Sequence, residues 1–377
     1  MMKKNIVVLS TTLLLISSMS FAQSILRTDH YEIKVQTLVS GLNHPWSIAF
    51  LPSGDKLVTE RSGRLRLIQE GELHPDPIKG VPQVAAIGQG GLLDVTLHPD
   101  FETNQWIYLA YSDQTDEGLT TRVMRARLKG HELIEAVDIF EALPRSAGGR
   151  HFGGRMVFDH EGYLYVSVGD RGEMERAQKG LDHAGTIIRL QDDGSIPKDN
   201  PFIDDHQVKN EIFTLGNRNP QGLTLHPETG EVWSNEHGPR GGDEINLIHA
   251  GLNYGWPKVT HGINYSGTSI TEHTELPGME SPLLDWTPSI APSGMVFYTG
   301  DAFPTWQGNI LNGALRDRLI SRVALVKTES GYLLTEEERF LQGLGERIRD
   351  IRQSPDGQLY LLTDHAHGSV LTLQRAD

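Results

Sequence analysis

Cysteine is absent from this sequence of 377 residues. Its absence excludes disulfide bonds, thiolate nucleophiles, thiolate-bound zinc and iron–sulfur clusters. Positive charge is also scarce, because 34 lysines and arginines stand against 49 aspartates and glutamates, for a formal net charge of −15 at pH 7. Such a chain repels phosphate groups, so we expect neither nucleic acid nor an anionic membrane as a partner.

Long hydrophobic runs are absent too, except for one short stretch near the N-terminus. Residues 1–22 combine two early lysines, an apolar stretch and a small-residue cleavage site ending at Ala22, which are the parts of a secretory signal peptide. The stretch is too short and too rich in serine and threonine for a membrane anchor. We predict a removable signal peptide over residues 1–22 and a mature protein that is periplasmic or secreted, with no membrane anchor. An uncleaved anchor is the alternative.

A two-strand pattern recurs six times in the rest of the chain. Each copy has a polar or Gly-rich start, a short alternating strand, a tight turn and a second strand that ends in charged residues. The turns lie at Pro52, Pro99, His160, Pro227, Pro304 and Pro355. Each interval is long enough for four short strands, and a four-stranded antiparallel unit repeated six times is typical of a β-propeller. We therefore predict an all-β, six-bladed β-propeller with four-stranded antiparallel blades, as a single domain over residues 23–377. A β-sandwich is the alternative.

The propeller geometry predicts which residues meet. The first strand of each blade lines the central channel, and the second strand returns, so the start of the first and the end of the second share one face. Polar residues gather at both positions: His44, Glu60, Arg61, Gln89, Asp113, His151, Asp170, Arg171, Arg218, Asn219, Glu236, His237, Arg316, Asp317, Arg318, Arg347, Arg349, Asp364 and His365. We expect these side chains to form a funnel at one mouth of the channel, where a ligand would bind.

The arginines of this funnel indicate the charge of the ligand. Five of them, Arg218, Arg316, Arg318, Arg347 and Arg349, converge on one mouth of an acidic protein. Because guanidinium groups bind carboxylate and phosphate in a bidentate manner, we expect a small polyanionic ligand. The alternative is that each arginine pairs with a neighbouring aspartate.

Two further segments carry chemistry. His151 lies in GRHFGGR and is predicted to lie near Asp170, which suits a general base, although an ordinary structural histidine is equally compatible with the sequence. The segment NEHGPRGGDEIN, from Asn235, combines glycines with two acids and suits Ca²⁺, or else forms a tight turn with solvated acids. The sequence contains no phosphate-binding loop, serine-hydrolase elbow or zinc-protease motif.

Six motifs follow one another along the chain: GQGGLLD, GRHFGGRMVFD, GNRNPQG, NEHGPRGGDEIN, NYGWP and ERIRDIR. With these motifs in this order, the chain resembles the soluble quinoprotein sugar dehydrogenases, above all the shorter bacterial aldose sugar dehydrogenases. The resemblance extends over about Leu38 to Gln374. It implies a six-bladed propeller that binds pyrroloquinoline quinone (PQQ), a planar tricarboxylate, together with Ca²⁺.

The resemblance also implies residue roles. His151 matches the general base of the family, Asp170 matches its acidic partner, and Arg218 matches the arginine that stabilises charge on the quinone. The matched cofactor-binding positions are Gln89, Arg218, Asn219, Tyr265, Arg316, Arg318, Arg347 and Arg349. Calcium at the quinone is matched by the main-chain oxygens of Gly238 and Pro239, and a second, structural calcium by Glu244 and Tyr254. Relatives commonly have lysine where Arg316 stands, and the longer insertions of the glucose-specific members are absent here.

The implied reaction is oxidation of the anomeric C1 hydroxyl of an aldose to a lactone, by base-assisted hydride transfer to PQQ. The electrons then pass to an external acceptor, and a monomer is favoured. Two alternatives are a calcium-dependent propeller lactonase or hydrolase and a non-catalytic sugar-binding propeller. A lactonase would not need five arginines at the mouth.

Overall fold

The structure is a computed structural model that describes residues 23–329 and 331–376. The predicted signal peptide, residues 1–22, lies outside the described residues. Within those residues, no helix has the length and apolar character needed to cross a membrane. The helical elements among the described residues are short: α1 (Phe101–Asn104), η1 (Met174–Gln178), η2 (Pro304–Trp306) and η3 (Gln342–Leu344).

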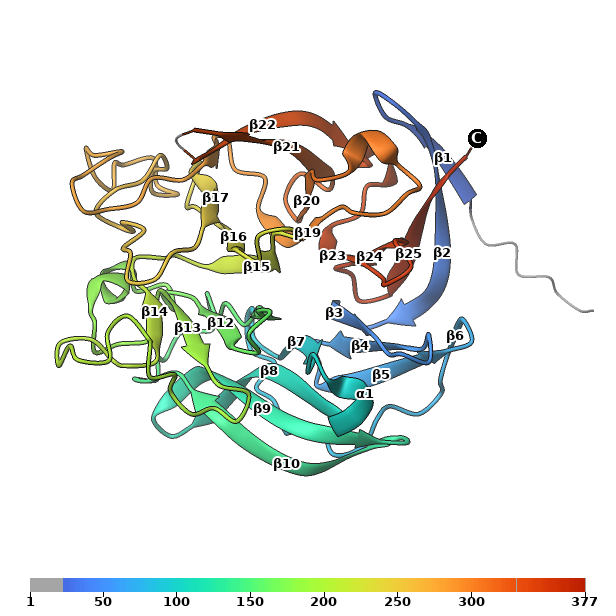
Figure 1. The fold of residues 1–377 in the computed structure, drawn as a ribbon, viewed down its shortest axis with the longest axis horizontal. Coiled ribbons are helices and arrows are strands. Elements are labelled where there is room, and N and C mark those ends of the chain that lie inside the picture. Colours follow the sequence, from blue (N-terminus) through green and yellow to red (C-terminus); the bar gives the residue numbers. More distant parts are fainter. Residues whose placement is uncertain (1–22, 330, 377) are drawn as a thin grey trace, which may run out of the picture.

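Six antiparallel sheets form the blades of a ring around a central channel, which confirms the predicted six-bladed β-propeller (Figure 1). From the innermost strand outward, blade 1 has β3 (Pro45–Phe50), β4 (Lys56–Glu60), β5 (Arg64–Gln69) and β6 (Glu72–Leu73). Blade 2 has β7 (Leu92–Leu97), β8 (Trp106–Thr115), β9 (Gly118–Lys129) and β10 (Glu132–Glu141). Blade 3 has β11 (Met156–Phe158), β12 (Leu164–Val168), β13 (Thr186–Leu190) and β14 (Ile212–Thr214).

The remaining blades follow the same plan. Blade 4 has β15 (Pro220–Leu225), β16 (Val232–Glu236), β17 (Asp243–Leu247) and β18 (Leu284–Trp286). Blade 5 has β19 (Pro292–Phe297), β20 (Ile310–Ala314), β21 (Ile320–Thr328) and β22 (Gly331–Phe340). Blade 6 begins with β23 (Ile348–Gln353), β24 (Leu359–Thr363) and β25 (Gly368–Arg375).

Blade 6 departs from the predicted four strands. Strand β2 (Glu32–Leu42), from the N-terminal part of the chain, pairs with β25, and β1 (Gln23–Arg27) adds a fifth strand at the rim. This pairing joins the two ends of the chain in one sheet, and it closes the ring. The repeats did not predict it, because β2 is not part of any recurring hairpin.

The inner hairpins turn where the sequence places proline and glycine. Between β3 and β4, Gly54 has a φ of 89°, and its amide donates to the Leu51 carbonyl at 2.9 Å. Between β23 and β24, Gly357 has a φ of 86°, and its amide donates to the Ser354 carbonyl at 2.9 Å. Glycine adopts positive φ readily, so these turns set the register of the two inner strands.

The axis of the ring is filled by buried ion pairs. Arg155 is 1% exposed, and its Nη1 lies 3.4 Å from Oδ1 of Asp94 and 3.2 Å from Oδ1 of Asp350. Arg352 contacts the same two carboxylates at 3.2 Å. Because these residues come from β7, from β23 and from the position directly before β11, the network ties together three blades around the axis.

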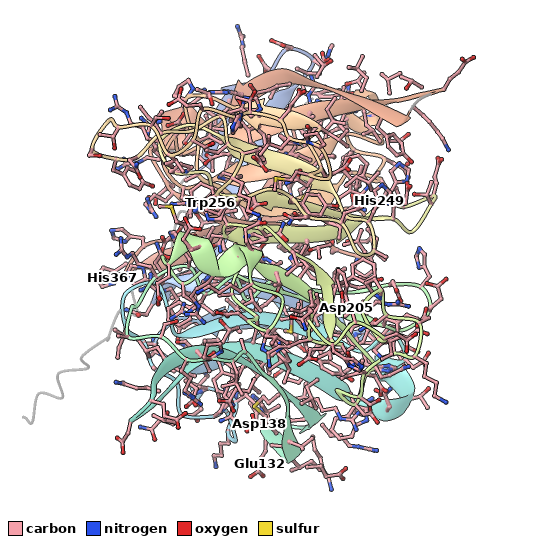
Figure 2. The ribbon with its side chains drawn as sticks, turned by 90° about the vertical axis from the view of Figure 1, so that its left-hand side faces the viewer. Glu132, Asp138, Asp205, His249, Trp256 and His367 are labelled. Atoms are coloured by element: carbon pink, nitrogen blue, oxygen red, sulfur yellow. The ribbon has the colours of Figure 1, made fainter. Side chains whose placement is uncertain are left out.

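The propeller has two distinct faces. In the side view of Figure 2, His367 lies toward the left-hand face and His249 toward the right-hand face. His367 follows β24, so the left-hand face is the one where second strands end. Any site built from those ends belongs to this face.

Candidate active site

A cavity opens at the mouth where first strands begin and second strands end. Every blade contributes to its lining, which consists of Trp46, Arg61, Gln89, Leu93, Phe152, Gly153, Asn219, Gln221, His237, Ala291, Leu315, Arg316, Arg347, Arg349 and Asp364. Five of the cofactor-binding positions suggested by the sequence, Gln89, Asn219, Arg316, Arg347 and Arg349, therefore lie around one cavity.

His151 and Asp170 form a hydrogen-bonded pair beside this cavity. Nδ1 of His151 lies 2.6 Å from Oδ1 of Asp170. His151 precedes the cavity residue Phe152 and has a φ of 50°, so the chain turns sharply just before β11. Asp170 follows β12, and the two side chains are 12% and 2% exposed. The hairpin between β11 and β12 thus brings the two residues together.

The surroundings favour a neutral imidazole next to an ionised carboxylate. Burial lowers the pKa of His151 most strongly, the hydrogen bond to Asp170 raises it, and the charge of Arg218 lowers it again, so the net pKa lies below its ordinary value. Burial raises the pKa of Asp170, but the hydrogen bond and the charge of His151, with help from Arg218, bring the net pKa below its ordinary value. A neutral imidazole whose Nδ1 carries the proton leaves Nε2 able to accept one.

The loop that carries His151 is clamped on both sides. Its own amide donates to Oε1 of Gln89 at 2.7 Å. Arg171 donates from Nη1 to the Arg150 carbonyl at 2.6 Å and from Nη2 to the Gly148 carbonyl at 2.7 Å. These contacts fix the backbone of the loop, and with it the position of the imidazole.

Arg349 and Arg347 converge on Asp364 at the opposite side of the ring. Nη2 of Arg347 lies 3.1 Å from Oδ2 of Asp364, and Nη2 of Arg349 lies 3.7 Å from the same oxygen. His44 contacts the other oxygen of Asp364 at 2.9 Å. Burial raises the pKa of Asp364, but Arg349, His44 and Arg347 outweigh burial and hold that pKa far below its usual range. One carboxylate therefore balances two arginines, which leaves net positive charge at the cavity.

The other predicted cationic and aromatic positions are more exposed. Nη1 of Arg316 donates to the Ser289 carbonyl at 2.6 Å and contacts Asp317 at 3.1 Å. Arg318 donates to the Gly345 carbonyl at 3.0 Å and does not line the cavity. Tyr265 is 75% exposed, in a loop outside the cavity lining. The structure thus brings Arg316 to the cavity, but not Arg318 or Tyr265.

Arg218 contacts the segment from Asn235 that the sequence connects with calcium. Its Nη1 donates to the carbonyls of His237 at 2.8 Å and Gly238 at 2.7 Å. Its Nε is buried without a hydrogen-bond partner. The Gly238 carbonyl is therefore shared between this guanidinium and any cation that binds there.

Two carboxylates of this segment, Glu236 and Glu244, occupy paired positions on the neighbouring strands β16 and β17. Burial raises the pKa of Glu244 well above its ordinary value, and the charge of Glu236 raises it further. The Tyr254 hydroxyl donates to the Leu247 carbonyl at 2.5 Å, so only its main chain remains for a metal. In the part of the chain that the structure describes, no three His, Asp or Glu side chains are placed to hold a metal ion. A cation here would need main-chain oxygens as well.

Several residues of the cavity wall had no predicted role. Trp46 is 2% exposed and lies on β3, and Gln221 connects two arginines because its side chain accepts from Arg349 at 3.0 Å and its carbonyl accepts from Arg155 at 2.8 Å. His237 was predicted in the funnel but not assigned a function. Gln221 lies in the RNPQG motif, which is the signal that would have found it.

Comparisons with known proteins agree over nearly the whole chain. Residues 42–372 match the family model described as Glucose / Sorbosone dehydrogenase. The aldose sugar dehydrogenase YliI of Escherichia coli is 45% identical, over 90% of this chain and 92% of that protein. The apo form of the soluble aldose sugar dehydrogenase from E. coli superimposes with a TM-score of 0.88 at 43% identity, covering 91% of this chain and 99% of that one. A PQQ-bound aldose sugar dehydrogenase from Streptomyces coelicolor has a TM-score of 0.76 at 26% identity, covering 91% and 98%.

Proposed function

The chain belongs to the glucose/sorbosone dehydrogenase family and is a sugar dehydrogenase, and we propose that it uses PQQ and Ca²⁺ to oxidise the anomeric C1 hydroxyl of aldoses to lactones. The observation that carries this proposal is the His151–Asp170 pair, with its 2.6 Å hydrogen bond, beside a cavity lined by arginines. One side of the cavity thus offers a base, and the other offers positive charge for an anionic cofactor.

The cavity residues fit a planar tricarboxylate. Arg316, Arg347 and Arg349 line it, and Arg218 donates to the carbonyl of the lining residue His237. Guanidinium groups form strong hydrogen bonds with carboxylates, so an anionic ligand would stabilise these arginines. We propose that these arginines, with Gln89 and Asn219, hold PQQ, and that Arg318 and Tyr265 approach it from the rim. When bound, PQQ supplies the two-electron acceptor for the oxidation.

The residues of this chain then move the proton. Nε2 of His151 accepts it from the anomeric hydroxyl, so the O–H bond breaks and an N–H bond forms. Asp170 accepts from Nδ1 and stabilises the imidazolium that results. Arg218 lies close enough to affect the pKa of both members of the pair, and its positive charge would stabilise negative charge that develops on a bound quinone.

Calcium has two proposed positions. The carbonyls of Gly238 and Pro239 would bind the ion next to the cofactor, where the Gly238 oxygen already accepts from Arg218. Glu244 and the main chain of Tyr254 would bind a second, structural ion. The repulsion between Glu236 and Glu244 supports that second position, because a divalent cation would relieve it.

The cellular setting is part of the same proposal. The leader at residues 1–22 supports export to the periplasm or beyond, where an external acceptor would reoxidise the cofactor. We propose that the exported protein works as a monomer without a membrane anchor, as one propeller domain over residues 23–377.

Reconstitution tests the proposal directly. Apoprotein titrated with PQQ and Ca²⁺ should acquire the absorption of bound quinone, and a panel of aldoses should convert it to the spectrum of the reduced form. Dye reduction with aldoses should require both additions, and His151→Ala should lower kcat by roughly 100-fold or more while PQQ still binds. Lactone hydrolysis without PQQ would instead indicate the lactonase alternative. Sugar binding without turnover in any preparation would indicate a binding propeller.

A further inference from the structure

Trp256 lies behind the His151–Asp170 pair, on the loop that follows β17 in blade 4. Its indole Nε1 donates to Oδ2 of Asp170 at 2.8 Å, and the residue is 6% exposed. We propose that Trp256 is a positioning residue: by occupying Oδ2 of Asp170, its N–H directs Oδ1 to Nδ1 of His151 and holds the imidazole in one tautomer. This inference rests on the proposed role of His151 as the base.

Both carboxylate oxygens of Asp170 already accept hydrogen bonds. Oδ1 accepts from His151 at 2.6 Å and from the Gly172 amide at 2.7 Å, and Oδ2 accepts from Trp256. Rotation of the carboxylate would break all three hydrogen bonds together. While this orientation keeps Oδ1 facing Nδ1, the ionised carboxylate can only accept, so the proton of the neutral imidazole lies on Nδ1. Nε2 is then bare, which is the form that a proton acceptor needs.

Trp256 is itself held firmly from several directions. Its amide donates to the Gly216 carbonyl at 2.9 Å, and its carbonyl accepts from Nε2 of Gln178 at 2.7 Å. Gln178 and Asn253 exchange two amide hydrogen bonds, of 3.0 and 2.9 Å. In Figure 2, Trp256 lies close to the short helix η1, in which Gln178 is the last residue. These contacts hold the main chain of Trp256 against blade 3 and against the segment that leads from blade 3 to blade 4.

The indole ring also touches the third member of the proposed catalytic group. The guanidinium carbon of Arg218 lies 5.2 Å from the ring centroid, within the range of a cation–π contact. Trp256 thus orients the Asp170 carboxylate through its N–H and contacts Arg218 through its ring. An apolar ring of similar size would keep the contact with Arg218 and remove only the hydrogen bond to Asp170.

Trp256→Phe removes the N–H donor and keeps most of the packing. A second variant replaces Trp256 by β-(3-benzothienyl)alanine, which keeps the shape of the indole and has sulfur in place of the N–H. Trp286→Phe is the matched control, because Trp286 is also buried and also donates to a carboxylate, that of Glu336 at 3.0 Å, and neither residue lines the cavity. All three changes remove one buried indole hydrogen bond.

The first readout needs no cofactor. Nitrogen NMR of the histidine rings in the apoprotein, assigned by the loss of signals in His151→Gln, distinguishes a protonated ring nitrogen from a bare one. We expect His151 to show a single Nδ1–H tautomer in the native protein and in Trp286→Phe. Both Trp256 variants should show a mixture of tautomers. The second readout is kcat of the reconstituted enzyme, which should fall about tenfold in both Trp256 variants and not in the control.

An unchanged tautomer in both Trp256 variants would overturn the inference. So would a loss of kcat that Trp286→Phe shares equally, since that would indicate a general effect on stability. If Trp256→Phe does not fold, the isosteric variant carries the test. Failure of the proposed function has a different signature: His151→Ala would keep its turnover while the tautomer still depended on Trp256.

Discussion

The guanidinium carbon of Arg171 lies 3.6 Å from the centroid of the Phe152 ring, next to the backbone that carries His151. Arg171 directly follows Asp170, so adjacent residues of one turn hold the imidazole ring and its backbone. Burial lowers the pKa of Arg171 to about 10, which still leaves it charged at neutral pH. Its charge strengthens the hydrogen bonds to the Gly148 and Arg150 carbonyls.

Replacement of this arginine should therefore affect both stability and rate. Arg171→Ala removes two charge-assisted hydrogen bonds, so we expect the free energy of unfolding to fall by about 2–4 kcal/mol. Because the loop then moves, kcat should fall about tenfold. Denaturant unfolding and steady-state kinetics measure the two effects.

Arg189 provides the matched control. It is also buried, its guanidinium carbon lies 3.9 Å from the Tyr163 ring centroid, and it donates to Asp199 and Asn200 in the outer part of blade 3. Arg189→Ala should lower stability and leave kcat unchanged. An Arg171→Ala enzyme with native kcat would show that the loop needs no clamp.

The pH profile should report the environment of His151. Its pKa is lowered by burial and by the charges of Arg218 and Arg150, and is raised by Asp170. The proton acceptor that we propose is the neutral imidazole, and a lowered pKa keeps it neutral to lower pH. The acid limb of kcat/KM should therefore lie below pH 6.5.

Arg150→Gln removes one of those positive charges from an exposed side chain. Without that repulsion the pKa of His151 rises, so the acid limb should move to higher pH while the maximal rate stays close to native. A profile with its acid limb at or above pH 6.5 in the native enzyme would contradict the assignment.

Cofactor retention should depend on the arginines that line the cavity. Arg347→Ala removes a half-exposed guanidinium and leaves Asp364 paired with His44 and Arg349. We expect the affinity for PQQ to fall about 10- to 100-fold, which is the scale of one charge-assisted hydrogen bond. Fluorescence quenching of the apoprotein by PQQ measures it.

The control for this variant is Arg27→Ala, since Arg27 forms an exposed ion pair with Glu32 in the outer strands of blade 6. That change should leave PQQ affinity native. Equal affinities in the native protein and Arg347→Ala would mean that the carboxylates of PQQ bind elsewhere.

A structural calcium ion should stabilise the folded chain. Glu244 and Glu236 repel each other, and a bound cation removes that cost. At 100 times its dissociation constant, Ca²⁺ should raise the free energy of unfolding by about 2.7 kcal/mol over a chelated sample. Thermal unfolding with Ca²⁺ or EGTA checks this expectation.

In Glu244→Gln, Ca²⁺ should give little of this increase in the free energy of unfolding. In the control Glu132→Gln, at an exposed rim position, Ca²⁺ should give the full increase. If Ca²⁺ gives the same increment to Glu244→Gln as to the native chain, the ion does not bind at Glu244.

The sequence repeats predicted the propeller because each hairpin depends on residues that are close together in the sequence. The Gly54 and Gly357 turns need only a few residues to fix a hairpin, and strand alternation decides which side of each strand is buried. The gathering of Gln89, Asn219, Arg316, Arg347 and Arg349 followed from the same reasoning, because a ring of blades places equivalent ends on one face.

Other features depend on contacts between distant segments. The pairing of β2 with β25, the indole hydrogen bond of Trp256 to Asp170 and the contact of His44 with Asp364 each join residues far apart in sequence. No local pattern marks these partners, since each pair meets only when two separate segments of the chain have packed together.

The sequence alone therefore determined the blades and the face on which the cavity opens, and it supplied the base that we propose, because hairpins and motifs are local. Only the tertiary structure decided how the ring closes, which oxygen of Asp170 faces His151, and which arginines line the cavity rather than the rim. Those choices arise from packing between blades, where side chains distant in sequence compete for the same few buried hydrogen-bonding groups.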